Sequence, residues 1–281
     1  RLGLPKLRTG LQNDTDSAYM EFPERSGASH SFGFLRGTGA LLEGQALKTD
    51  NGGQLHYHFG AYNNDVAGGA FAGAAGFPGG LAGNIGPNES VALNYVIGAM
   101  SRMNGGNTSE HWTEGDLDQT GDTDLALGLN YRWDNDRLGG VKDEATTLNI
   151  FGGWKNGGGI AIQGELWSRE DKISGASADS LGYYVQGSYT TAPGEGTQYG
   201  FALRYSSVDD KDGGRITPVP SQYFMLPATG GIVGPSKMTE IQLALNAYYH
   251  KHLLKAQLAY TYMKVDDTVG GAADSSNNGL Q

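Results

Sequence analysis

The sequence has no cysteine, no long hydrophobic run and no surplus of basic residues, and each absence excludes a class of protein. Without cysteine, a disulfide framework, a thiolate metal site and a thiol nucleophile are all impossible. No apolar run approaches the ~20 residues that a transmembrane helix needs. The formal net charge is −10 and the basic residues are scattered, so we predict no nucleic-acid partner.

Glycine, in contrast, is abundant, with 46 residues among 281. The glycines form no triplet repeat, which excludes a collagen-like fold. The mean hydropathy of −0.41 is too polar for a helical membrane protein. It is compatible with a transmembrane β-barrel, because only alternate residues of such a barrel face lipid. The chain starts at Arg1 and not at methionine, so we expect a mature or truncated product of a longer precursor.

A period of two residues indicates β-strands in 241–249 and 254–262. In the first of these segments, Ile241, Leu243 and Leu245 alternate with Gln242 and Ala244. A helix would repeat its apolar positions every three to four residues. The two segments are therefore predicted to form a hairpin with a short turn at 250–253.

The same alternation recurs along the chain and predicts about ten strands. The further strands are expected at 38–47, 55–59, 91–98, 125–133, 146–155, 160–168, 181–189 and 199–206. Their length of roughly nine to eleven residues is near that which crosses a bilayer at a tilt. Short links are expected at 51–53, 156–159, 193–196 and 250–252, and longer links at 65–88, 135–144, 170–180 and 208–238. This alternation is typical of outer-membrane barrels, although the long link 104–122 stands where a short turn is due.

The two faces of these strands differ in chemistry. One face carries Leu, Ile, Val and Tyr, with aromatic residues concentrated at the strand ends. The other carries Gly, Ala, Ser, Asn and Gln with isolated charges. Aromatic rings at membrane interfaces would explain the first face. The alternative is a soluble β-protein, in which the apolar face is an ordinary core and Tyr is present because it favours strands.

Three stretches of the sequence resemble the phosphate-selective porin O and P family. The first is LGLPKLRTGLQNDTDSAYMEFPERS at 2–26, and the second is RGTGALLEG at 36–44 followed by LHYHFGAYNND at 55–65. The third is 240–262, in which Asn246-Ala247-Tyr248-Tyr249 precedes the spaced residues His252, Lys255, Gln257 and Tyr260. It is similar to the penultimate hairpin of these porins.

The resemblance implies an all-β transmembrane antiparallel barrel of sixteen strands, of which about ten are represented here. We accordingly expect 1–281 to be a single β-barrel domain, incomplete at both ends, with long loops at 65–88, 104–122 and 208–238. It implies a passive channel in the bacterial outer membrane for anions or small hydrophilic solutes, and not an enzyme. The implied partners are the lipid bilayer, lipopolysaccharide, small anions and two further copies in a homotrimer. Neither a cofactor nor a metal is expected.

Residues opposite the apolar face are the candidates for lining the pore. The candidates are Arg132, Lys155, Arg204, Lys255, Gln242, Asn246, Gln257 and Glu165. Rings of Arg and Lys attract anions. The alternative is that the four basic residues only balance Glu43 and Glu165 on the inner wall. Much of the acidic charge, including Asp134 and Asp171, is expected in loops, where it need not set the field at a constriction.

The two longest loops and the overall function keep alternatives open. Loop 208–238 has an apolar tip at 223–226 and either folds into the pore, packs on a neighbouring loop or binds a partner. Loop 65–88 is rich in Gly and Ala and is either flexible or packed at a subunit boundary. The rival functions are a structural envelope barrel with a blocked lumen and a soluble β-rich protein that binds carbohydrate. An outer-membrane hydrolase is also conceivable, but no particular serine is indicated.

Overall fold

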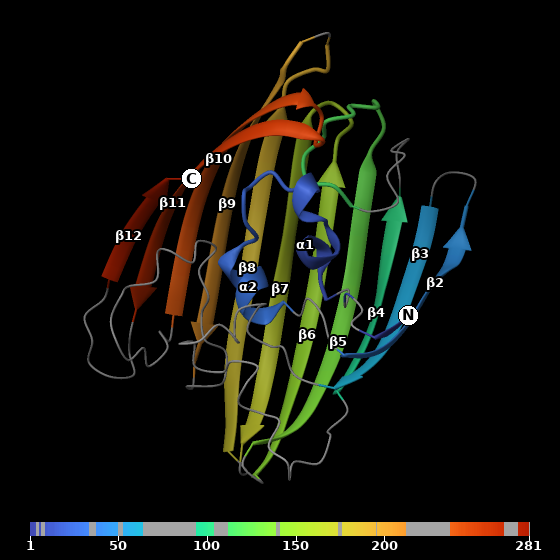
Figure 1. Cartoon of the computed structure of the whole chain (residues 1–281), viewed down its shortest axis with the longest axis vertical. Helices are drawn as coiled ribbons and strands as arrows, with labels where there is room; N and C mark the ends of the chain where they lie inside the picture. The colour runs from blue at the N-terminus through green and yellow to red at the C-terminus, as the bar shows by residue number, and fades with distance from the viewer. Residues whose placement is uncertain are drawn as a thin grey trace.

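A computed structural model of the chain is dominated by one antiparallel sheet, in which twelve strands follow in chain order from β1 to β12 (Figure 1). The structure describes residues 1–3, 6, 9–33, 38–49, 53–63, 94–103, 112–138, 141–173, 176–194, 196–211, 237–266 and 275–280. Within these ranges no hydrogen-bonded pairing joins β12 to β1. The all-β prediction is confirmed.

The strands are long and the helices are short. The strands are β1 (Leu2–Gly3), β2 (Thr38–Lys48), β3 (Gly53–Asn63), β4 (Asn94–Met103), β5 (Asp124–Leu138), β6 (Val141–Lys155), β7 (Ile160–Ile173), β8 (Ala176–Thr190), β9 (Gln198–Asp210), β10 (Lys237–His250), β11 (Leu254–Asp266) and β12 (Ser275–Leu280). The helical elements are α1 (Leu11–Asp14), the 3₁₀ turn η1 (Ser17–Tyr19) and α2 (Gly27–Phe32). None of the helices in these described parts has the length and apolar character needed to span a membrane.

The strand register keeps like side chains on one face of the sheet. Leu245 on β10 lies opposite Leu258 on β11, and the next pair is Ala244 with Ala259. A slip of one residue would exchange the two faces of the sheet. The predicted alternation therefore corresponds to a sheet with one continuous apolar face and one face of small and polar residues.

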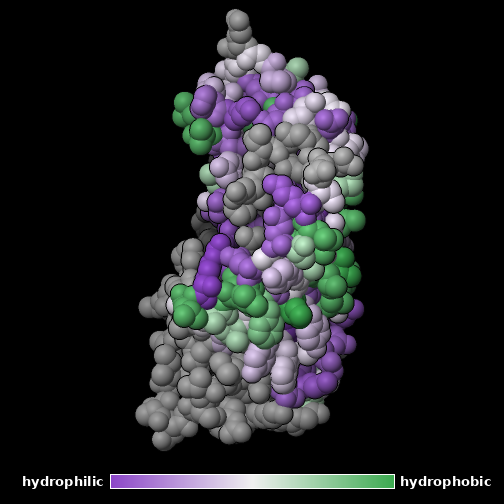
Figure 2. All heavy atoms as spheres, turned by 90° about the vertical axis from the view of Figure 1, so that its right-hand side faces the viewer, coloured by the Kyte–Doolittle hydropathy of each residue, from purple (hydrophilic) through white to green (hydrophobic). Residues whose placement is uncertain are grey.

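The apolar face is the exposed one. Leu127, Ile150, Val185 and Leu203 are all about half exposed, whereas the polar residues between them are buried. In the view of Figure 2, hydrophobic residues gather at mid-height along the side of the molecule. This arrangement is the inverse of a soluble protein, which buries its apolar side chains. The soluble alternative predicted these rows to be packed against another layer, and the exposure contradicts it.

Aromatic side chains mark both ends of the exposed face. Toward one end of the apolar rows, the Tyr95 and Trp133 rings stack at 5.7 Å and the Tyr183 and Tyr205 rings lie 5.9 Å apart. Tyr189 lies at the other end of β8 and is also exposed. Six residues separate Tyr183 from Tyr189, which corresponds to about 20 Å along the strand. At the usual strand tilt this is about 15 Å in depth, less than the ~25 Å apolar band of a typical transmembrane barrel, and the order of aromatic, apolar and aromatic residues is the one that such barrels show.

Two of the predicted long links are wrong. Residues 135–144 and 170–180 lie mainly in strands, because β5 pairs with β6 as far as Leu138 opposite Val141, and β7 pairs with β8 as far as Ile173 opposite Ala176. The charged residues in these stretches break the apolar alternation, so the sequence pattern underestimates the strand lengths. The structure also adds β12, which pairs with β11 beyond the last strand that the pattern predicts.

Two segments of the chain cover the inner face of the sheet. The N-terminal inner segment (residues 9–33) contains α1, η1 and α2, and Figure 1 shows these elements lying across the sheet. The second inner segment (residues 112–119) is the later part of the predicted loop 104–122, and it is almost entirely buried. Both segments pack their apolar side chains against the wall, so the hydrophobic clusters of this molecule lie inside the curved sheet.

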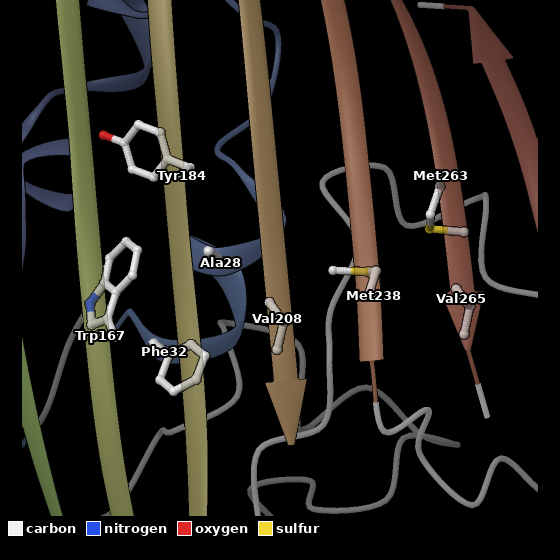
Figure 3. Packing of buried hydrophobic residues seen from close by; sticks show 8 residues of the cluster. All are labelled: Ala28, Phe32, Trp167, Tyr184, Val208, Met238, Met263 and Val265. Carbon is white, nitrogen blue, oxygen red and sulfur yellow. The ribbon is translucent and has the colours of Figure 1, made fainter. Parts of the chain in front are cut away.

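The largest of these clusters fixes α2 on the wall. Phe32 stacks on Trp167 of β7 with ring centroids 6.1 Å apart, and Ala28 joins the same cluster (Figure 3). Met238 and Met263 line the cluster from β10 and β11. Ser26 caps α2 by accepting a hydrogen bond from the Ser29 N–H at 3.0 Å, as is usual at a helix N-terminus.

The remaining predicted loops fall largely on residues that the structure does not describe. Loop 65–88 lies entirely outside the described residues, and so do residues 212–236 of loop 208–238. The alternatives for these two loops are therefore untested.

Candidate pore interior

All eight predicted pore residues lie on the inner face of the sheet, so their predicted orientation agrees with the structure. Lys255 and Gln257 are half-buried, and the other six are almost completely buried. Several of them contact the two inner segments directly. Whether they line a conducting pore stays a prediction.

The second inner segment is bound to the wall through Glu114 and Trp112. Glu114 is fully buried and accepts hydrogen bonds from the amides of Gln163 on β7 at 2.9 Å and Gln186 on β8 at 3.0 Å. The indole N–H of Trp112 donates to the Gln163 side-chain carbonyl oxygen at 2.8 Å. Wall glutamines therefore replace the water that a buried carboxylate and indole would otherwise require.

Lys155 on β6 contacts the same segment. Its ammonium group donates to the Thr113 hydroxyl at 2.8 Å and lies 4.7 Å from the centroid of the Trp112 ring. A cation over an indole face is an attractive contact that strengthens when it is desolvated. Gly153 on the same strand provides the necessary space, because a Cβ there would collide with the Trp112 ring.

Glu114 also joins the two inner segments to each other. It accepts a hydrogen bond from the Gln12 side chain at 3.0 Å and one from the backbone N–H of Glu21 at 2.8 Å. The side-chain carbonyl oxygen of Gln12 in turn accepts from the backbone N–H of Ser26 at 2.8 Å. Removing the Glu114 carboxylate would leave donors on both segments and on the wall without their acceptor.

Arg204 and Lys255 hold the middle of the N-terminal inner segment. Arg204 on β9 donates to the Glu24 carbonyl at 2.8 Å, and its guanidinium lies 4.1 Å from the Phe22 ring centroid. Lys255 on β11 donates to the Met20 carbonyl. These two cations thus satisfy backbone carbonyls of a segment that has no strand partner there.

The predicted amides and Glu165 form polar contacts along the same wall. Glu165 accepts from the Gln12 backbone N–H at 2.6 Å and from the Tyr184 hydroxyl at 3.0 Å. Gln257 donates to Asn246 at 3.0 Å. Gln242 accepts from Arg204 at 2.7 Å and donates to Thr261 at 2.9 Å.

Arg132 belongs to a buried charge cluster with no net charge. It donates to Asp134 at 2.8 Å, and Arg169 lies 3.4 Å from Asp134 and 2.8 Å from Asp171. The expectation that Asp134 and Asp171 lie in loops is wrong, because both are on inner-facing strand positions. Their charges therefore neutralise arginines on the wall, a pairing that neither the anion path nor the alternative of balancing by Glu43 and Glu165 included.

The profile of the phosphate-selective porin O and P family matches residues 1–280, which is essentially the whole chain. The chain belongs to this family. It is therefore an outer-membrane porin that forms a channel for small anions, as the resemblance implied. No curated protein matches the chain. The exposed apolar rows and the aromatic belts of the sheet agree with a wall that faces membrane lipid.

A cavity of about 210 Å³ lies between α1 and the strands β2 to β4 of the porin. Asp14 from the N-terminal inner segment, Glu43 from β2, and His56 and His58 from β3 contribute its polar lining. Met100 is part of its apolar lining. This cavity lies beside residues that the sequence analysis did not place among the eight pore candidates.

A second, smaller gap of about 10 Å³ lies next to Arg132, between Phe32 and the wall. Asn130 lines this gap, and His58 lines the larger cavity. Gly98 lies between these two residues and has no side chain, so Asn130 and His58 can approach each other; a Cβ at Gly98 would collide with both. The cavity and the gap are thus neighbours along the inner wall of the porin.

Outside the strands, the described titratable groups with the largest shifts in pKa are Glu21, His30 and His252, and burial is the first cause in each case. Burial, followed by the charge of Glu114, raises the pKa of Glu21 to about 7. Burial and two nearby arginines, beginning with Arg25, lower the pKa of His30 to about 3. Burial and Lys255 lower the pKa of His252 to about 3. At neutral pH both histidines are uncharged, whereas Glu21 is near its titration midpoint.

Sequence reasoning missed the residues that bind the inner segments to each other, above all Gln12, Glu21 and Glu114. They lie in stretches with no period of two, so no strand pattern singles them out. The sequence signal that could have revealed these segments is the presence of glycine at inner-facing strand positions. Gly153, like Gly182 under Phe32, is an inner-facing glycine where a pore wall in water would accept a larger polar side chain.

Proposed function

We propose that small anions diffuse through this porin, without a chemical step, between its N-terminal inner segment and the wall formed by β2, β3 and β4. The supporting observation is the cavity of about 210 Å³ at that place. Elsewhere, Lys155, Arg204 and Lys255 are bound to the inner segments and support their attachment to the wall. The route would pass His58 and Asn130 toward Arg132.

The polar lining gives this route a mixed charge. Glu43 pairs with Arg1 at 2.5 Å, and Asp134 is neutralised by Arg132 and Arg169, so two acids near the route are already compensated. Side-chain charges in a narrow lumen decide which ions pass. The pairing leaves no strong field of either sign from these residues, so the expected preference for anions over cations of equal size rests on the family.

Cysteine accessibility tests the route cleanly, because the chain has no cysteine of its own. We would compare His56→Cys, in the cavity, with Ala126→Cys, which is buried beneath Trp112 on β5. Each variant is reconstituted in a planar bilayer at pH 6 and exposed to an anionic or a cationic methanethiosulfonate. His56→Cys should react and lose conductance, the anionic reagent should react faster, and Ala126→Cys should not react.

The outcomes separate the parts of the proposal. Equal reactivity of Ala126→Cys would show that solutes pass along the side that the inner segments cover. A faster reaction of His56→Cys with the cationic reagent would contradict anion preference along this route.

We also propose that the porin assembles as a homotrimer and binds lipopolysaccharide at the ends of its strands. Lys172, Lys237 and Lys264 lie in outward rows at the end of the sheet where β3 leads to β4 and β9 to β10 through long connections. Each is about half exposed and pairs with a nearby carboxylate, of Glu170, Asp209 and Asp266 respectively. In outer-membrane barrels the long loops lie on the external side. Lysines at that depth are suited to the phosphates of lipopolysaccharide.

Light scattering in detergent would measure the mass of the assembly, and a monomer would refute the trimer. Binding of purified lipopolysaccharide should weaken when Lys172, Lys237 and Lys264 are replaced together by Gln. Lys251→Gln, at the short-turn end, is the matched control and should bind normally. Equal binding by both variants would contradict the proposed contact.

A further inference from the structure

We propose that Glu21 and Glu114 form a proton-controlled latch. The N-terminal inner segment stays on the wall while this pair of carboxyl groups holds a proton, and loss of the proton releases the segment and widens the lumen. The proposal concerns the half of the lumen that the inner segments fill. It depends on the chain being a channel but not on the route proposed above.

Two carboxyl groups, one from each inner segment, accept hydrogen bonds from the same side-chain amide. The side-chain nitrogen of Gln186 on β8 donates to Glu21 at 3.1 Å and to Glu114 at 3.0 Å. The backbone N–H of Glu21 also donates to Glu114 at 2.8 Å. Both glutamates are almost completely buried. Two carboxylates that share one buried site cannot both ionise without a large cost.

The backbone of the second inner segment approaches the Glu21 carboxyl closely. Gly115 has φ +70, and a Cβ at this residue would lie 2.5 Å from the Oε1 atom of Glu21. The proton therefore sits between the two inner segments and not in open solvent. The pKa of Glu21 is raised to about 7, first by burial and then by Glu114, which agrees with a neutral group in the closed form.

Other charged and titratable groups face Glu21 from the wall. Lys155 on β6 opposes the rise in the pKa of Glu21, but its effect is smaller than those of burial and Glu114. Lys255 on β11 and Tyr248 on β10 also interact electrostatically with Glu21. Both lysines donate to the inner segments themselves, Lys155 to Thr113 and Lys255 to the Met20 carbonyl. Their contacts would be lost together with the latch.

Release would expose basic side chains to the lumen. Arg204 is covered by the Phe22 ring and bound to the Glu24 carbonyl, and Lys255 is bound to the Met20 carbonyl. With residues 20–24 displaced, both cations would face water. The released form should therefore conduct more and select more strongly for anions.

The sign of the pH dependence follows from linkage. Glu21 binds its proton more tightly when the segment is seated, so its contribution to the seated form is fully present below about pH 4.5, the ordinary value for Glu. The contribution falls as pH rises toward about 7 and is constant above. One pKa unit corresponds to tenfold in an equilibrium constant, so the full change is on the order of 100-fold.

His30 and His252 act in the opposite direction. Their pKa values are lowered to about 3, so charging them as pH falls below about 6.5 also loosens the inner segments. The comparison of the native chain with Glu21→Gln removes this contribution, because both proteins keep both histidines. Gln resembles the protonated carboxyl group in shape and cannot ionise.

The test measures access to the wall beneath the segment. Ala244→Cys places a thiol on β10 under Phe22, with which Ala244 forms a buried cluster. Its reaction with neutral methyl methanethiosulfonate is measured from pH 5 to pH 8 in lipid vesicles, with and without Glu21→Gln. Gly194→Cys, where nothing lies within 4 Å of the new Cβ, is the reference for an accessible thiol. Dividing the Ala244→Cys rate by the Gly194→Cys rate at each pH removes the effect of thiol ionisation on the reaction.

We expect the corrected rate of the protein that keeps Glu21 to rise, relative to that of the Glu21→Gln variant, by up to about 100-fold between pH 5 and pH 8. A constant ratio would overturn the latch. If Ala244→Cys does not fold, the conductances of the native chain and of Glu21→Gln decide: their ratio should rise over the same range, and a flat ratio overturns the proposal. A failed route test with His56→Cys would leave this result unaffected.

Discussion

Placing one charge at the middle of the exposed face tests whether that face meets lipid. Leu245 is the outward residue of β10 between Phe201 on β9 and Leu258 on β11, both of which are exposed. Leu245→Arg places a guanidinium among these side chains. An arginine on the lipid face costs about 2–4 kcal/mol at the bilayer midplane, because it must be desolvated or must distort the bilayer.

The matched control lies on the same strand and the same face. Tyr249 has the same exposed fraction as Leu245, 57%, but it is next to the short turn. Four residues correspond to about 13 Å along the strand, or about 10 Å in depth at the usual tilt. Tyr249→Arg should therefore cost only about 0–1 kcal/mol, as is found near the interface.

The free energies of unfolding would be measured by reversible urea titration of both variants in lipid vesicles. We expect Leu245→Arg to be less stable than Tyr249→Arg by about 2–3 kcal/mol. In a soluble protein, two positions of equal exposure would tolerate arginine equally well. Equal stabilities in vesicles would therefore refute the assignment of the apolar face to lipid.

Two further predictions concern the interior. The buried Arg102 lies 3.1 Å from the Asp124 carboxylate, so Asp124→Asn removes its counter-charge and should destabilise the porin by about 3–5 kcal/mol in the same assay. Adding Arg102→Met should recover most of this loss, and a double variant as unstable as Asp124→Asn would contradict the prediction. Gly182→Leu should push the Phe32 ring off β8 and speed hydrogen exchange of the α2 amides by about tenfold, whereas Gly187→Leu, which meets nothing within 4 Å, should leave them unchanged.

The fold could be predicted to the extent that side chains alternate. The rows of β8 to β11, such as Leu243 and Leu245 against Gln242 and Ala244, specify both the strands and their faces. The ends of β5 to β8 could not be predicted, because those strands continue beyond the apolar belt into charged residues such as Asp171. Pairing with a neighbour, and not burial of an apolar row, keeps them extended.

The orientation of the pore candidates could be predicted, but their partners could not. The alternation of side chains between the two faces of a strand places Lys155 and Arg204 on the inner face, and both are there. This alternation does not reveal that Thr113 accepts from Lys155 and the Glu24 carbonyl from Arg204, because these acceptors come from segments far away in sequence and without a periodic pattern. Contacts of this kind depend on the shape of the folded wall.

The small residues of the inner face explain how one wall can serve both a channel and a packed interior. Ala202, Ala244 and Ala259 lie side by side on β9, β10 and β11, and Phe22 packs against them. If the wall only bordered water, long polar side chains would fit there as well as alanine. Alanines matched to a phenylalanine indicate that this part of the sheet is shaped for an inner segment. The space that solutes use is then set by the position of that segment as much as by the diameter of the sheet.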